Sequence, residues 1–201
     1  MDHHINVSSG MSEKVVSFQD VEIRGAREYL LLLVAWNDFH SELRASLKKH
    51  SEVLAKAVGR KAAWVEAYEA QQAHEEVIEK AWPEEIKVRM INEQDPFLLI
   101  IDTSFARFDP TTNRSAVVWF SDWGNRPSEV WKPLAALQKR ILLENDLFAY
   151  FENLRIRALR SKWIRRFNKL TQYFELSLPI IPGFVSVHID AVIADTLGQL
   201  E

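Results

Sequence analysis

The chain has 201 residues, of which 47% are hydrophobic, and its 25 basic and 28 acidic residues give a formal net charge of −3. This composition is sufficient for a sizeable core, and the acidic balance excludes a protein that coats nucleic acid with its whole surface. The absence of cysteine excludes disulfides, thiolate metal ligands and cysteine nucleophiles, and it agrees with a cytoplasmic location, which we expect.

The first part of the chain shows no targeting signal. Residues 1–12 lack a basic region followed by an apolar run, so no secretory signal is predicted. We expect these residues to form a disordered tail, and residues 13–201 to form a single globular domain. The longest apolar run, Tyr29–Trp36, is too short to cross a membrane, and no membrane span is predicted.

A heptad-like spacing of apolar residues begins after Gly25. Its steps of 4 and 3 connect Tyr29, Leu33, Trp36, His40, Leu43 and Leu47 and continue through Leu54 and Val58. Such spacing predicts a helical hairpin over residues 26–80 that turns near His50 or Gly59, or one kinked helix. The candidate residues for contact with another protein chain, or for self-association, are Trp36, His40, Leu43 and Leu47. A lone histidine among apolar residues is typical of a core or interface position, so His40 is not predicted to bind a ligand.

The middle of the chain is ambiguous between helix and strand. Pro83 followed by Glu84 and Glu85 suits a helix start, whereas the next residues, IKVRMI, alternate as in a strand. The apolar run Phe97–Asp102 is favoured as a strand, although its spacing also fits a helix. Further strands are predicted over Ser115–Trp123 and Phe184–Ile189.

Two helices are predicted between these last strands. The first begins at Ser128, and Asn145-Asp146 separates it from the second, which we expect over residues 146–175. In the second helix the apolar residues fall within an arc of about 80°, the width of a core-facing stripe. The segment from Arg155 to Lys169 contains seven basic residues and no acidic residue. The candidate residues for contact with a nucleic-acid backbone or an acidic partner are Arg155, Lys162, Arg165, Arg166 and Lys169.

An acidic segment offers an internal alternative for this charge. Residues 66–85 contain seven glutamates and one lysine, a net charge of −6. Two helices of opposite sign in one chain can neutralise each other, although exposed pairs contribute only about 0–1 kcal/mol each.

Asp102 is the most suggestive position for enzyme chemistry. A carboxylate at the end of an apolar strand is a frequent metal ligand in nucleases and phosphodiesterases, but such sites need two to four converging carboxylates. Asp109, Asp122 and Asp190 are the other acids considered for such a site. A turn carboxylate that accepts backbone N–H groups explains Asp102 equally well.

These patterns together predict an α+β fold that is predominantly helical. Its parts are the long N-terminal hairpin, a small antiparallel sheet and two C-terminal helices, and an all-α bundle with residues 84–108 helical is the alternative. The predicted function is that of a non-catalytic interaction subunit whose basic helix contacts a phosphate backbone or an acidic partner. The alternative is a metal-dependent nuclease centred on Asp102. No catalytic residue, cofactor or metal ligand is assigned in the first hypothesis.

Overall fold

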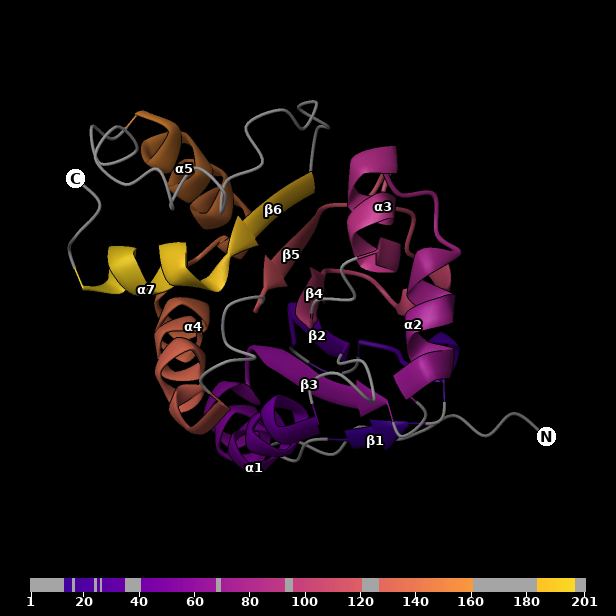
Figure 1. The fold of residues 1–201 in the computed structure, drawn as a ribbon, viewed down its shortest axis with the longest axis horizontal. Helices are drawn as coiled ribbons and strands as arrows, with labels where there is room; N and C mark the ends of the chain where they lie inside the picture. The colour runs from indigo at the N-terminus through magenta and orange to yellow at the C-terminus, as the bar shows by residue number, and fades with distance from the viewer. Residues whose placement is uncertain are drawn as a thin grey trace.

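The computed structural model describes residues 13–15, 17–23, 25, 27–34, 41–67, 70–92, 96–120, 127–160 and 184–197. These residues form three layers, in which a twisted sheet is covered by helices on both faces (Figure 1). None of the helices in these ranges combines the length and apolar composition that a membrane span requires.

In the described part of the chain the sheet has six strands, in the order β1-β3-β2-β4-β5-β6. Their bounds are β1 Glu13–Val15, β2 Tyr29–Val34, β3 Ala62–Ala67, β4 Phe97–Ile101, β5 Ser115–Trp119 and β6 Phe184–His188. The pairs β1–β3, β2–β3 and β5–β6 are parallel, and β4 is antiparallel to both β2 and β5. Five strands therefore run in one direction, and β4 alone runs against them.

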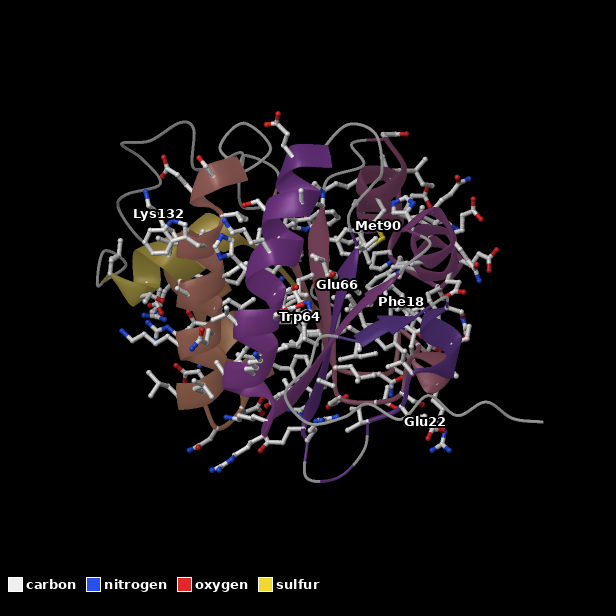
Figure 2. All side chains as sticks on the ribbon, turned by 90° about the horizontal axis from the view of Figure 1, so that it is seen from below. Phe18, Glu22, Trp64, Glu66, Met90 and Lys132 are labelled. Carbon is white, nitrogen blue, oxygen red and sulfur yellow. The ribbon has the colours of Figure 1, made fainter. Side chains whose placement is uncertain are left out.

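The helices divide between the two faces of the sheet. One face carries α1 Ser41–Val58, α4 Trp131–Leu143, α5 Leu147–Arg160 and α7 Ile189–Thr196. The other face carries α2 Ala70–Ile78 and α3 Glu84–Asn92, with the short 3-10 helices η1 Phe18–Asp20 and η2 Phe105–Arg107. A further 3-10 helix, η4 Pro127–Glu129, precedes α4. Alternate strand residues enter the two cores: Leu31 and Trp64 pack under α1, whereas Leu32 and Val65 pack under α2 and α3. Figure 2 shows the same division, with Trp64 close to α1 and Met90 and Phe18 on the other side.

The predicted helical hairpin over residues 26–80 is wrong. Tyr29–Val34 and Ala62–Ala67 are neighbouring parallel strands, and α1 is the crossover helix between them. The heptad-like spacing of apolar residues led to a wrong prediction of helix because all six residues of β2 are buried. A strand covered on both faces is a continuous apolar run, and any two of its residues four apart also satisfy a helical pattern.

The predicted small antiparallel sheet and the all-α alternative are also wrong. The sheet is mixed and contains three parallel pairs. Parallel pairs need crossover helices that cover the faces of the sheet, and the alternation of strands with helices along this chain supplies them. The class of the fold is therefore three-layer α/β rather than a predominantly helical α+β arrangement.

Several local predictions are confirmed. Phe97–Ile101 is a strand. The alternative left open after Pro83 is decided for helix, because α3 begins at Glu84 and contains the residues IKVRMI. α4 ends at Leu143 and α5 begins at Leu147, so the predicted break at Asn145-Asp146 is present. The helix predicted to start at Ser128 starts instead at Trp131 and has no side-chain cap. The helix predicted over residues 146–175 is described as far as Arg160, and its remainder and the tail 1–12 lie outside the described residues.

Candidate functional site

Helices α4, α5 and α7 surround an open cleft of about 830 Å³. α4 contributes Arg140 and Leu143, α5 contributes Asn153 and Arg157, and α7 contributes Asp195. α4 and α5 follow each other in the chain, whereas α7 comes from the C-terminal part, and the packing of α7 against them creates the cleft.

Asp195 is the centre of the polar wall of this cleft. Its side chain is 5% exposed, and its two oxygens form ion pairs with Arg140 Nη2 and Arg157 Nη1, each at 2.7 Å. The Tyr150 hydroxyl donates a hydrogen bond to Asp195 Oδ2 at 2.9 Å. A buried carboxylate requires such partners, since an unpaired charge in the interior costs several kcal/mol.

The two arginines of this cluster differ in exposure. Arg140 is 18% exposed, and it also pairs with Glu144 at 3.2 Å and donates from Nε to Thr196 Oγ1 at 3.2 Å. Arg157 is 42% exposed and presents part of its guanidinium to the cleft. Arg140 is therefore fixed within the protein, whereas Arg157 retains donors that face solvent.

Tyr150 acts as a hydrogen-bond donor in this cluster. Burial raises the pKa of its hydroxyl, and the negative charge and hydrogen bond of Asp195 raise this pKa further. The phenol therefore keeps its proton throughout the neutral range, and it supports Asp195 rather than serving as a nucleophile or base.

The predicted basic residues divide between described and undescribed parts of the chain. Arg155 lies on α5, where its side chain is 14% exposed and donates to Glu152 at 3.1 Å. Arg155 is thus largely withdrawn from the surface. Lys162, Arg165, Arg166 and Lys169 lie outside the described residues.

The predicted interface residues of the N-terminal part are likewise divided. Trp36 and His40 lie outside the described residues. Leu43 belongs to α1, but the structure describes only its backbone. Leu47 is fully buried in the core between α1 and the sheet. It therefore contacts the protein's own core in this structure.

The acidic segment 66–85 does not lie beside α5. Glu66 is buried on β3, where its carboxylate accepts a hydrogen bond from Trp64 Nε1 at 2.9 Å. The exposed acids of α2 and α3 belong to the opposite helical layer, with the sheet between them and α5 (Figure 1). The internal neutralisation considered from the sequence is therefore not available to the described part of the basic helix.

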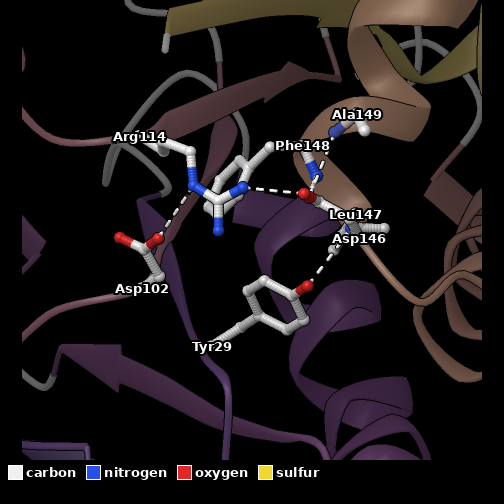
Figure 3. Close-up of polar contacts among 7 residues, drawn as sticks. All are labelled: Tyr29, Asp102, Arg114, Asp146, Leu147, Phe148 and Ala149. Atoms are coloured by element: carbon white, nitrogen blue, oxygen red, sulfur yellow. Dashed lines mark hydrogen bonds and ion pairs between the residues drawn. The ribbon is translucent and has the colours of Figure 1, made fainter.

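Asp102 takes part in a second arginine–carboxylate cluster (Figure 3). Arg114 donates from Nε to Asp102 Oδ2 at 3.2 Å and from Nη1 to Asp146 Oδ2 at 2.7 Å. Its guanidinium also lies over the Phe148 ring, 4.9 Å from the centroid. Nearby, the Tyr29 hydroxyl accepts a hydrogen bond from the backbone N–H of Leu147 at 3.1 Å. This cluster ties the β4–β5 hairpin and β2 to the start of α5.

Asp146 also caps α5. Partial burial acts to raise its pKa, but hydrogen bonds from the N–H groups of Ala149 and Phe148 and the charge of Arg114 outweigh it, and the pKa lies below its ordinary value. These are the contacts of a helix N-cap, which stabilise the charged form of the carboxylate.

The geometry around Asp102 gives no support to the nuclease alternative. The described residues contain no group of three or more His, Asp or Glu side chains placed to hold a metal. The Arg114 guanidinium bridges Asp102 and Asp146, so a positive charge already bonds to both carboxylates. Asp102 also lies at the edge where most strands begin, whereas ligands of open α/β sheets bind beyond the carboxyl ends of the parallel strands.

The Asp195 cluster was not anticipated from the sequence. Its members come from three helices, and no local spacing connects residue 195 with residues 140, 150 and 157. One signal was present, because Asp195 directly follows the apolar run AVIA in the final helix IDAVIADT. Comparison of the chain with protein-family models, with curated proteins and with solved structures finds no match.

Proposed function

We propose that the protein is a non-catalytic interaction subunit in the cytoplasm, and that the basic segment beginning in α5 contacts a nucleic-acid backbone or an acidic protein partner. The observation that carries the proposal is the separation of charge by the sheet, with α5 on one face and the glutamates of α2 and α3 on the other. Because those glutamates lie beyond the sheet, they do not pair with Arg155 or Arg157, the described basic residues of α5. Clustered arginine and lysine without acidic neighbours in sequence are typical of phosphate-binding surfaces.

The cleft beside α5 supports this proposal. Arg157 has exposed donors at its wall, and Asn145 and Asn153 add amide groups that both donate and accept hydrogen bonds. Leu143 and Ile156 contribute apolar surface to the same cleft. Arg157 is therefore the position at which an acidic group of a partner would find a charged contact, while Glu144, Asp146 and Asp195 make the rest of the polar lining acidic. The separate contact with another chain through Trp36 and His40 stays a prediction.

The basic segment is tested by reversing four of its charges together. In the variant Lys162→Glu, Arg165→Glu, Arg166→Glu and Lys169→Glu, we expect loss of binding to single- and double-stranded nucleic acid and to acidic peptides. If the partner is duplex DNA, binding by the unaltered protein should weaken with salt with a log–log slope of about −4, because about four or five phosphates are neutralised. Fluorescence anisotropy at several salt concentrations measures the affinity of the variant and the salt dependence of binding by the unaltered protein.

A matched control changes the net charge by the same amount elsewhere. Lys49, Lys56, Arg60 and Lys139 are exposed and lie outside α5, and their joint replacement by glutamate should leave most of the binding intact. Equal loss in both variants would show that only net charge matters. Unchanged binding after reversal of the basic segment would refute the proposal.

A further inference from the structure

Helix α3 exposes one face that is both apolar and acidic. Val88 and Ile91 are 44% and 45% exposed, although valine and isoleucine are normally buried. Glu84, Glu85 and Asn92 are exposed beside them. At 100° per residue these five positions span an arc of about 120° with Val88 near its middle. The opposite side of α3, with Ile86 and Met90, is buried against the sheet.

Helix α2 extends the acidic part of this face. His74 of α2 lies against α3, with Nε2 3.0 Å from the carbonyl oxygen of Met90. Glu75 of α2 and Glu79 just after it are exposed. The two helices thus form one layer (Figure 1), which we call the α2–α3 face and define by Glu75, Glu79, Glu84, Glu85, Val88 and Ile91.

Two cations of the same layer are turned inward. Lys80 Nζ donates to the Phe105 carbonyl oxygen at 3.0 Å and lies 4.6 Å from the centroid of the Phe105 ring. Arg89 is 7% exposed, and its guanidinium lies 4.2 Å from the centroid of Trp119. Because these two cations face the core while the glutamates face solvent, the exposed charge of the α2–α3 face is mainly negative, with the partly exposed Lys87 the one other cation of α3.

We propose that the α2–α3 face is a docking surface for a basic amphipathic helix of a protein partner. Val88 and Ile91 provide the apolar contact that such a helix buries, and the surrounding glutamates favour lysine and arginine beside its apolar stripe. The same charges repel nucleic acid and anionic membranes. This surface is separate from the described part of α5, which lies on the opposite face of the sheet.

A synthetic peptide with the sequence of residues 155–169, RIRALRSKWIRRFNK, is a suitable probe. It carries seven positive charges and, in a helix, an apolar stripe of Ile156, Leu159, Trp163 and Phe167. A scrambled peptide of the same composition keeps the charge and removes the stripe. We expect the full-length protein to bind the first peptide more tightly than the second, and to bind it more weakly as salt rises.

Two variants of the protein separate the charged and apolar contributions. Glu84→Lys with Glu85→Lys, and Val88→Ser with Ile91→Ser, should each weaken peptide binding by about tenfold. The controls lie in α1 on the other face: Glu42→Lys with Glu52→Lys makes the same charge change, and Val53→Ser alters a residue that is 65% exposed. Both controls should bind as the unaltered protein does, and circular dichroism verifies that every variant is folded.

The outcomes decide the proposal. Equal binding of the two peptides, equal binding by the α3 variants and their controls, or no binding would overturn it. Self-association of the protein that disappears in both α3 variants would support it and identify a second copy as the partner. A variant with the basic segment reversed tests the function proposed for α5 separately, so the two proposals fail independently.

Discussion

Two arginine–carboxylate clusters fix α5, and they differ in their access to water. At the start of the helix, Arg114 bridges Asp102 and Asp146 with side chains that are 49%, 27% and 44% exposed. Further along the helix, the side chain of Asp195 is 5% exposed. It forms ion pairs with Arg140 and Arg157 and accepts a hydrogen bond from the Tyr150 hydroxyl. The same types of group are therefore expected to have different energetic roles: the exposed bridge adds little stability, whereas breaking the buried cluster leaves charges uncompensated.

Removal of the buried carboxylate gives the largest expected effect. Asp195→Asn leaves Arg140 and Arg157 without their shared counter-charge, and we expect the free energy of unfolding to fall by about 3 kcal/mol. Asp102→Asn, the matched change in the exposed bridge, should cost less than about 1 kcal/mol. Urea unfolding of the two variants measures the difference, and similar losses would contradict the comparison.

Removal of a tyrosine hydroxyl is expected to lower the free energy of unfolding by an intermediate amount. Tyr150→Phe removes a hydrogen bond to a buried carboxylate, and a loss of about 2 kcal/mol is expected because hydrogen bonds to charged groups are the stronger ones. Tyr29→Phe removes the acceptor for the buried N–H of Leu147, and about 1 kcal/mol is expected. Thermal unfolding of both variants checks the order, and a larger loss for Tyr29→Phe would reverse it.

The exposed bridge gives the smallest effect, and this effect depends on pH. The folded-state pKa of Asp146 lies below its ordinary value of 3.8, so its contribution is present above that value and is lost as pH falls through the folded-state pKa. We expect Arg114→Met to lower stability by about 0.5 kcal/mol at pH 7 and by less at pH 3. Urea midpoints at the two pH values measure this change. A difference between the proteins that stayed constant with pH would exclude a role for the Asp146 charge.

The sequence predicts those elements whose pattern is local. Phe97–Ile101 and the break before α5 depend on short-range preferences, and both were found as expected. After Pro83 the local signals conflicted, and the helix start prevailed over the strand-like alternation of IKVRMI. The strand Tyr29–Val34 was mistaken for helix because burial on both faces removes the alternation that distinguishes a strand. The predicted architecture was wrong because the hairpin replaced two neighbouring strands, Tyr29–Val34 and Ala62–Ala67, with helix, and such an exchange changes the whole sheet.

The candidate site was beyond sequence reasoning for a different reason. Asp195 meets Arg140 and Arg157 only because α7 packs on α4 and α5, and no spacing in the sequence encodes this contact. Arg155 was predicted to face a partner, yet it is largely buried beside Glu152. The position of a flanking residue on a helix is set by the neighbouring elements, which the hydrophobic period does not specify.

The parallel pairing of β5 with β6 has a consequence for how the chain acquires its structure. Residues 115–119 pair with residues 184–188, and the intervening chain contains α4 and α5. Such distant contacts form only after a large loop has closed, and the entropy cost of that closure precedes the favourable contact energy. Topologies of this kind therefore fold slowly. We therefore expect the N-terminal βαβ unit to form early, and the arrival of β6 and α7 to be the late step that completes the cleft.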